Sequence, residues 1–181
     1  IDPHVEVVPP PKTEYGEAYK PPPTHVIGKL LETWGIEMPN NKIVGDRIAA
    51  QRVGAMSGGR RVVTDYLPWL SIGKFGIDKE DVITSEIKRI NVISAGYLKL
   101  RQDSNLTMKP LIFASNQSQL LNIESIRPNP NPVELLSNFV GDQLSKPIAA
   151  RFLGKINSSF PEGPPDRTDD TSSKGPDPKL V

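Results

Sequence analysis

Two serine–lysine pairs have the spacing that a catalytic unit could use. Ser71 and Lys74 stand in the stretch SIGK, and Ser85 and Lys88 stand in SEIK. At this spacing the lysine can activate the serine as a nucleophile when the serine begins a helix. Glycines surround the first pair and predict a loop, whereas the second pair falls inside an expected helix. Neither context suits the reaction, so we expect the chain not to be an enzyme.

The sequence contains no set of side chains that is suited to bind a metal ion or a cofactor. Cysteine is absent, which excludes disulfides and thiolate ligands. His4 and His25 are the two histidines, and neither has a partner at the spacing of a metal motif. The adjacent acids Glu80 and Asp81 suit the first turn of a helix, where the helix dipole favours carboxylates. We therefore predict no metal site and no cofactor.

A basic stretch over residues 42–61 is the candidate anion-binding region. It reads KIVGDRIAAQRVGAMSGGRR and contains one acid, Asp46. Its glycines could turn backbone N–H groups towards an anion, although their order is not that of a phosphate-binding P-loop. The candidate ligands all carry a guanidinium group that can contact phosphate: Arg47, Arg52, Arg60 and Arg61. An anion-binding or nucleic-acid-backbone-binding module is therefore one alternative function.

Proline and aromatic side chains are the candidate contacts to partner proteins. The stretches VVPPPK and YKPPPT favour the extended polyproline II conformation, which acts as a spacer or binds aromatic grooves. Large rings on short helices and loops cover either the domain core or a partner. The candidate partner-binding residues are Pro21, Pro22, Pro23, Trp34, Trp69 and Phe75.

A helix over Thr24–Gly35 is the best helical signal in the N-terminal half. Apolar residues recur at helical spacing, Thr24 can cap the first turn, and Gly35 can end the helix in the left-handed conformation. The basic stretch at 42–61 also fits a helix, but loosely, because each interior glycine weakens a helix by about 1 kcal/mol.

Further helices are expected in the second half of the chain. Residues 79–92 show helical spacing, and their β-branched side chains leave a strand from Ile87 onwards as the alternative. The stretch NPVE at 131–134 combines an asparagine cap, a proline at the first helical position and a glutamate in the first turn. We expect it to begin a helical pair that extends to residue 156.

Strands are expected in the middle of the chain. Gly58-Gly59 predicts a turn, and residues 60–64 predict a short strand after it. The stretch DYLPWLSIGKFGIDKEDV reads as a loop because of its proline and glycines. Alternation near 97–101 and the stretch LTMKPLIFAS predict a hairpin, in which Pro110 places the second strand at an edge. The stretch QSQLLNIESI predicts a third strand.

The expected fold class is α+β, with one small domain that has a short mixed or antiparallel sheet, several short helices and long extended terminal arms. A mainly β body is the alternative. We divide the chain into a proline-rich arm (1–23), a single domain (24–160) and a polar tail rich in proline and glycine (161–181). Both arms carry a net negative charge and the domain a net positive one. No run of about 18 apolar residues occurs, so we predict no membrane span.

These features favour a non-enzymatic structural subunit of a large homo- or hetero-oligomeric assembly, with arms that bind neighbouring subunits. The start at Ile1, without methionine, favours a processed virion or capsid component located in the virion. One alternative is a periplasmic or surface component of a bacterial secretion or appendage machine, with a periplasmic or extracellular location. Anion or nucleic-acid-backbone binding through Arg47–Arg61 is the other alternative.

Overall fold

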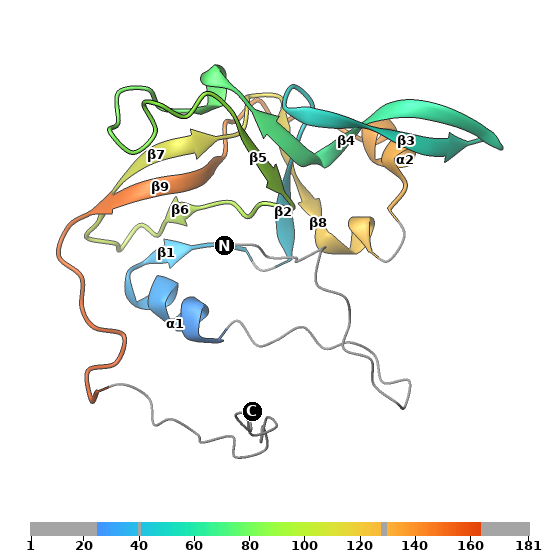
Figure 1. The fold of residues 1–181 in the computed structure, drawn as a ribbon. Coiled ribbons are helices and arrows are strands. Elements are labelled where there is room, and N and C mark those ends of the chain that lie inside the picture. The colour runs from blue at the N-terminus through green and yellow to red at the C-terminus, as the bar shows by residue number, and fades with distance from the viewer. Residues whose placement is uncertain (1–24, 40, 128–129, 164–181) are drawn as a thin grey trace, which may run out of the picture.

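Most of the chain forms short strands whose partners are distant in the sequence (Figure 1). The computed structural model describes residues 25–39, 41–127 and 130–163. Within these residues the strands are β1 (Ile36–Glu37), β2 (Lys42–Asp46), β3 (Ala50–Ser57), β4 (Arg60–Ile72), β5 (Ile90–Ile93), β6 (Lys99–Leu100), β7 (Thr107–Phe113), β8 (Ser118–Asn122) and β9 (Pro147–Leu153). The helical elements are α1 (His25–Thr33), α2 (Pro132–Ser137) and the single turns η1 (Lys74–Gly76) and η2 (Ile123–Ile126). The favoured α+β class is thereby corrected to its alternative, a mainly β body.

All the strand pairs in the described part of the chain are antiparallel. The sheets have the orders β1-β6, β2-β8, β3-β4-β5 and β7-β9. An isolated bridge between Ile77 and Ile112 ties the segment after β4 to the β7-β9 sheet. Only β3 and β4 are joined by a tight turn, so the other sheets bring together residues that are far apart in sequence.

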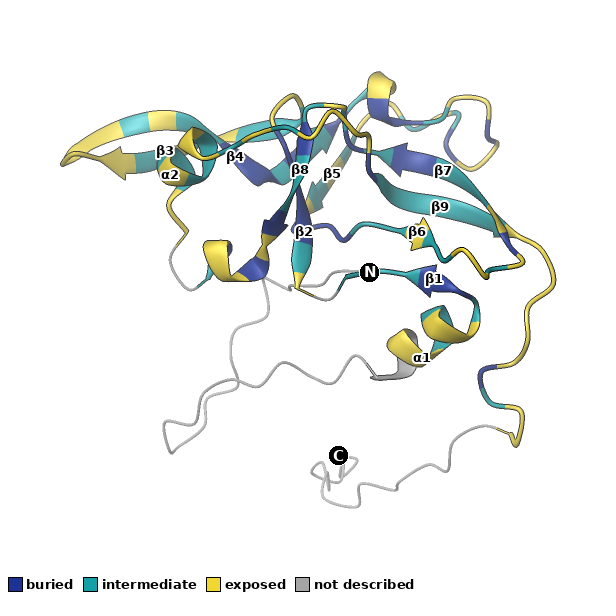
Figure 2. Cartoon of the chain, turned by 180° about the vertical axis from the view of Figure 1, so that it is seen from behind, coloured by how far each residue is buried: buried dark blue, intermediate teal, exposed yellow. Residues whose placement is uncertain are grey.

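Strand β2 lies at the centre of the core. Successive side chains of a strand point to opposite faces, and here both faces are covered. Val44 belongs to a buried cluster with Leu70, Ile72, Ile77, Ile112 and Ala114. Ile43 belongs to a second cluster with Leu67, Leu121, Ile123 and Ile126. Figure 2 shows this buried centre and the exposed outer half of the β3–β4 hairpin.

Helix α1 confirms the first predicted helix and its glycine end. Gly35 has φ +66°, and its amide donates to the carbonyl of Glu32 at 3.0 Å. A Cβ at this position would also meet the side chain of Ser104. Glycine is therefore required both by the left-handed conformation and by the close contact.

Helix α2 confirms the capping signal but is much shorter than the predicted helical pair. The Asn131 Oδ1 accepts a hydrogen bond from the Glu134 amide at 3.3 Å, and Pro132 occupies the first helical position. The helix ends at Ser137, and β9 takes the place of the expected second helix. A helix as short as α2 gains little by itself, so pairing with β7 decides the conformation of the later residues.

The helix expected over residues 79–92 is also wrong. Asp78 Oδ1 accepts from the Glu80 amide at 2.9 Å, and Asp81 Oδ1 accepts from the Ile83 amide at 3.0 Å. These local side-chain contacts form turns that compete with a helix. The chain then enters β5, which agrees with the alternative reading of a strand in this stretch.

Residues 42–61 form β2 and β3 instead of a loose helix. The strands let Val44 and its neighbours enter the core, whereas the glycines of this stretch weaken a helix. The predicted Gly58-Gly59 turn is confirmed, with φ values of +55° and +76°. The strand after it is confirmed too, but it runs on to Ile72 through residues that we expected to form a loop.

The predicted central hairpin has the wrong pairing. Strand β6 pairs with β1, and β7 pairs with β9, with a register shift beside Pro110. The third predicted strand is confirmed as β8, although its partner is β2. Residues 1–24 and 164–181 lie outside the described residues, so the division into arms and domain stays a prediction.

Candidate functional site

The β3–β4 hairpin projects from the body of the molecule and carries three of the four candidate arginines (Figures 1 and 2). Its two-residue turn has positive φ at both glycines, the combination of a type I′ turn. This turn matches the natural twist of two antiparallel strands, so it supports a long two-stranded arm. Arg60 and Arg61 follow the turn directly and lie at the tip of the hairpin.

The arginines are spread along the hairpin and do not form one cluster. Directly opposed residues share a face, so the pairing of Met56 with Arg61 and of Arg52 with Asp65 puts these side chains on one face. Arg60 is on the opposite face because neighbouring strand residues alternate. Arg47 lies in the turn before β3, where its amide donates to the Gln117 carbonyl. The four arginines therefore do not form a single compact anion-binding site.

The four arginines keep their full charge exposed. All of them are exposed, and no ion pair joins any of them to another described residue. Residues 47–64 contain no acid. The preceding acid, Asp46, is fully buried and cannot serve as a surface counter-charge. Asp65, which lies opposite Arg52, is the one acid of the hairpin, so its outer part with Arg60 and Arg61 is a basic surface.

Two exposed apolar side chains lie among these charges, and sequence reasoning missed them. Met56 is 64% exposed and Val63 is 62% exposed, on the same face as Arg52 and Arg61. Exposed apolar side chains beside arginines are typical of protein interfaces. A two-residue alternation in the stretch after Ala50 was the available signal, but the helical interpretation of this stretch hid it.

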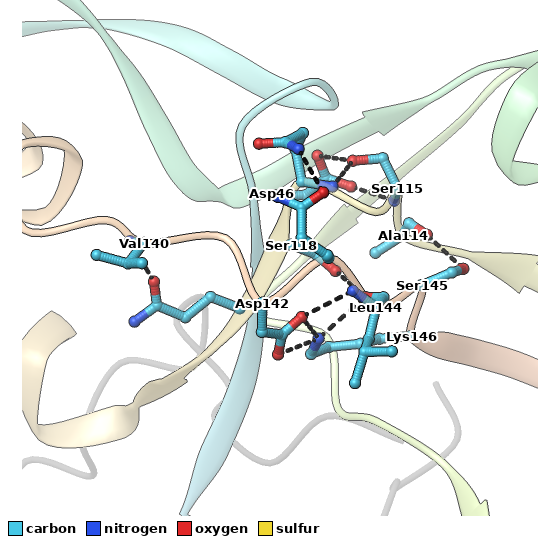
Figure 3. Close-up of polar contacts among 12 residues, drawn as sticks. Asp46, Ala114, Ser115, Ser118, Val140, Asp142, Leu144, Ser145 and Lys146 are labelled. Atoms are coloured by element: carbon cyan, nitrogen blue, oxygen red, sulfur yellow. Dashed lines mark hydrogen bonds and ion pairs between the residues drawn. The ribbon is translucent and has the colours of Figure 1, made fainter.

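The base of the hairpin is held by the buried carboxylate of Asp46 (Figure 3). Its Oδ1 accepts from the Ile48 amide at 2.7 Å, the Ala49 amide at 3.1 Å and the Ser115 hydroxyl at 2.9 Å. Its Oδ2 accepts from the Ser115 amide. The carboxylate therefore fixes the turn that leads from β2 into the hairpin and links it to the segment after β7.

A second polar cluster in Figure 3 joins Asp142 to Lys146. The buried Lys146 ammonium lies 2.6 Å from both carboxylate oxygens of Asp142 and donates to the Leu144 carbonyl at 3.0 Å. Partial burial raises the pKa of Asp142, but the Lys146 ammonium and the Leu144 amide outweigh it, so the pKa is lowered overall. Lys146 is thus anchored by an ion pair that fixes the loop before β9.

This pair predicts a loss of stability in acid. Because the folded-state pKa of Asp142 lies below the ordinary value of about 3.9, its contribution is complete above that value and disappears as the pH falls through the folded-state pKa. We expect Asp142→Asn to have a lower free energy of unfolding than the wild type at about pH 7. At about pH 2 the difference between the two proteins should be much smaller. Urea unfolding at both pH values measures this.

Asp103→Asn is the matched control for that experiment, because Asp103 pairs with Arg101 at a surface position. Exposed pairs contribute about 0–1 kcal/mol, so this variant should follow the wild type at both pH values. A gap between Asp142→Asn and the wild type that stays constant down to the acid limit would contradict the assignment.

A third cluster holds two acids against two bases. Lys109 Nζ lies 2.7 Å from Asp78 Oδ2 and 3.5 Å from Asp81 Oδ2, and Arg151 Nη2 lies 2.7 Å from Asp81 Oδ1. The Lys109 ammonium lowers the pKa of Asp78, and Asp78 in turn raises the pKa of Lys109. The charges balance, so the cluster ties the 78–84 turn to the β7-β9 sheet.

The serine–lysine pairs do not form a catalytic arrangement in the described residues. Ser71 Oγ accepts from Arg89 Nη1 at 3.1 Å, while the Lys74 ammonium lies 4.9 Å from the centre of the Phe75 ring. Ser71 lies on β4 and Ser85 in a turn, so neither begins a helix. Among the described residues, no group of three or more histidine, cysteine or acidic side chains could hold a metal ion.

The candidate partner-binding rings have different environments. Trp34 is half-buried, and its Nε1 donates to the Asn157 carbonyl at 3.2 Å. Trp69 packs edge-on against Tyr66, with ring centres 5.4 Å apart. Phe75 is 86% exposed and is the freely presented ring of the three. Pro21, Pro22 and Pro23 lie outside the described residues, so their role stays a prediction.

Two grooves follow the outer edges of strands. One, of about 330 Å³, lies between β8 and α2. The other, of about 390 Å³, follows β3 and contains Tyr66 and Trp69. Sequence reasoning identified neither groove, because the partners of β3 and β8 were not predictable. None of the helices in the described part of the chain is long and apolar enough to cross a membrane.

Comparison with known proteins identifies a family whose model matches this chain. The family model described as an ABC-type uncharacterized transport system matches residues 1–181. No curated protein and no solved structure matches the chain.

The family match overturns the prediction of a virion or capsid component, since a transport system is neither. It agrees better with the alternative of a component of a bacterial envelope machine. The expectation of protein partners is correct at a coarse level, because the partners belong to a transport system.

Proposed function

Because the chain belongs to the ABC-type uncharacterized transport system family and is an auxiliary component of such a system, we propose that it acts without catalysis and docks on an acidic surface of its transport partners through the β3–β4 hairpin. The exposed arginines of the hairpin, none of which forms an ion pair with another described residue, are the observation that supports this docking role most directly. A transport auxiliary is associated with the cell envelope, and a periplasmic or outer-surface position is part of the proposal.

The composition of the hairpin fits a protein contact. Interfaces are enriched in arginine and methionine and depleted in lysine, and all the cations between residues 47 and 64 are arginines. Planar guanidinium groups can form two parallel hydrogen bonds with a carboxylate, which fixes the orientation of a partner. Met56 and Val63 add apolar contact area between these charges.

The shape of the hairpin supports the same role. Its outer half lies away from the core (Figure 2), and the face that carries Met56, Arg61 and Val63 is exposed to a partner. The opposite face is half-buried at Val53, Ala55 and Val62. The Asp46 carboxylate fixes its base, which limits the ordering cost when a partner binds. A charged, pre-organised arm of this kind would mainly set the specificity and the rate of association.

Charge reversal of the hairpin tests the proposal. We expect Arg52→Glu, Arg60→Glu and Arg61→Glu together to weaken binding to the purified membrane complex of the same transport system by at least about 100-fold, since like charges across an interface cost several kcal/mol. Binding of the wild type should also weaken between about 50 and 300 mM salt. Titration by biolayer interferometry measures both effects.

The matched control carries the same change of net charge at exposed lysines on other elements. Lys74→Glu, Lys88→Glu and Lys155→Glu together should keep the wild-type affinity. Equal affinity of the two triple variants, with unchanged circular dichroism, would refute docking through the hairpin. The location is tested separately with an impermeant amine reagent on intact and lysed cells, where labelling confined to lysed cells would contradict an outer-surface position.

A further inference from the structure

The groove between β8 and α2 follows an open strand edge. Its volume is about 330 Å³. One wall is the run Gln119–Asn122 of β8, and the other is α2, which contributes Glu134 and Leu135. Strand β8 pairs with β2 on one side and with no described strand on the other. None of the four arginines of the basic stretch lines this groove.

The backbone of Leu120 faces the groove. The Val44 amide donates to the Ala95 carbonyl at 2.8 Å, so the polar groups of Val44 point away from β8. Val44 and Leu120 are therefore a pair of the type that is not hydrogen-bonded in an antiparallel ladder. It follows that the N–H and C=O of Leu120 point away from β2. No hydrogen bond joins either group to another described residue.

The outward carbonyls on either side of Leu120 already have partners. The Ser118 carbonyl accepts from the Asp142 amide at 3.0 Å, and the Asn122 carbonyl accepts from the Ser125 hydroxyl at 2.6 Å. These contacts limit the open edge to a short stretch centred on Leu120. One residue of an extended segment can complete it with two hydrogen bonds, as in strand addition.

Glu134 gives the groove its charge. Among the described residues that line the groove, it is the one with a charged side chain, and it is exposed. Its carboxylate forms no ion pair with a described base, and its nearest printed contact is Asn131 Nδ2 at 3.4 Å. A cationic side chain would complement this carboxylate.

The two faces of β8 decide where that cationic side chain must lie. Leu120 packs against the cluster around Val44, whereas Leu121 belongs to the other cluster, which Leu135 of α2 also contacts. A residue paired with Leu120 would turn its own side chain to the face of Leu120, away from α2. Its two neighbours would turn theirs towards α2 and Glu134, because side chains alternate along a strand.

We propose that the β8 groove binds a short extended segment of a transport partner, with lysine or arginine next to the residue that pairs with Leu120. The free backbone groups select an extended peptide, and the Glu134 carboxylate selects a basic one. Both arms of this chain carry a net negative charge, so charge complementarity favours a segment of another protein. In naming a transport partner the inference rests on the proposed function, but the site itself does not use the hairpin.

Amide hydrogen exchange of the full chain tests the open edge. Gln119 and Leu121 form the hydrogen-bonded pairs with β2, so their amides should be protected. The Leu120 amide should exchange at least about tenfold faster than both. Equal protection of the three amides would overturn the proposal, because it would show that a segment of this chain or a second copy already covers the edge.

The peptide acetyl-Lys-Val-Lys-amide tests the occupant in a heteronuclear NMR titration of the full chain. We expect a saturable shift of the Leu120 amide. N-methylation of the valine removes the N–H that would face β8 and should weaken binding at least about tenfold. N-methylation of the second lysine is the matched control, since that N–H points away from β8, and should change the affinity by less than about twofold.

Glu134→Gln tests the charge. It should weaken binding of acetyl-Lys-Val-Lys-amide by about fourfold and leave acetyl-Gln-Val-Gln-amide unaffected, because an exposed ion pair contributes modestly. Glu124→Gln is the matched control, since Glu124 is exposed on η2 and does not line the groove.

The triple variant Arg52→Glu, Arg60→Glu and Arg61→Glu should still bind the peptide, so the result is separate from docking through the hairpin. Three results would each overturn the proposal: no saturable shift at Leu120, equal effects of the two methylations, or equal affinity of Glu134→Gln and the wild type for the lysine peptide.

Discussion

Asp46→Ala is expected to lower the free energy of unfolding by about 4 kcal/mol, because it removes a buried acceptor and leaves several donors without a partner. Asp46 has no exposed surface, and its carboxylate accepts from the amides of Ile48 and Ala49 and from both donors of Ser115. Hydrogen bonds to a charged acceptor contribute about 1.5–3 kcal/mol each, and those lost here hold the turn after β2 and its link to Ser115. Denaturant unfolding monitored by circular dichroism measures the loss.

Asp46→Asn is the informative companion variant. It keeps the shape and one acceptor oxygen, but its amide nitrogen would point a donor at a donor of Ser115. We expect a loss of about 2 kcal/mol, between the wild type and the alanine variant. A loss below about 1 kcal/mol for Asp46→Ala would show that the loop does not depend on the carboxylate.

Gly76→Ala is expected to cost about 3 kcal/mol, because a Cβ at this position would overlap the main chain of a neighbouring strand. The added carbon would collide with the carbonyl oxygen of Phe113 and with the Ile72 side chain at 2.5 Å. A backbone carbonyl inside a paired strand cannot move aside as a flexible side chain could. The thermal midpoint should fall accordingly, and differential scanning calorimetry measures it.

Gly73→Ala, three positions earlier, is the matched control. Nothing lies within 4 Å of a Cβ built on Gly73, and its φ of −99° suits any residue. This variant should keep the wild-type midpoint or exceed it slightly, since alanine restricts the unfolded chain. Similar losses for the two alanine variants would mean that the glycine content of this loop matters and the contact with Phe113 does not.

Features fixed by neighbouring residues could be predicted from the sequence. The asparagine cap and proline at the start of α2, the Gly58-Gly59 turn and the left-handed Gly35 are all found as expected. Each depends on a side chain or φ value within a few residues, so no tertiary information is needed. Such a signal does not predict how long the following element is, as the short α2 shows.

Strand partners could not be predicted, because pairing depends on residues that are far apart. Helical spacing over residues 79–92 was misleading, since the carboxylates of Asp78 and Asp81 form turns there. Alternation near Leu100 was read correctly as a strand, but its partner lies in β1 and not in the next strand. Such choices are decided by the whole core, which a local pattern does not contain.

In the candidate site, too, the local features could be predicted from the sequence and the long-range ones could not. The exposed arginines could be found from the sequence, because four arginines follow a single acid in one stretch. Their distribution over two faces, and the exposure of Met56 and Val63, required the register of β3 with β4. Membership in a transport family could not be deduced from any motif in the chain.

The pairing of β2 with β8 has a consequence for biosynthesis. Lys42 and Asn122 are 80 positions apart, so this sheet has a high contact order and must close a long loop before it forms. During translation, Ile43 and Val44 leave the ribosome long before Leu121 and Ile123 exist to cover them. The nascent chain therefore presents its most deeply buried strand for several seconds, the interval in which a chaperone has to shield it.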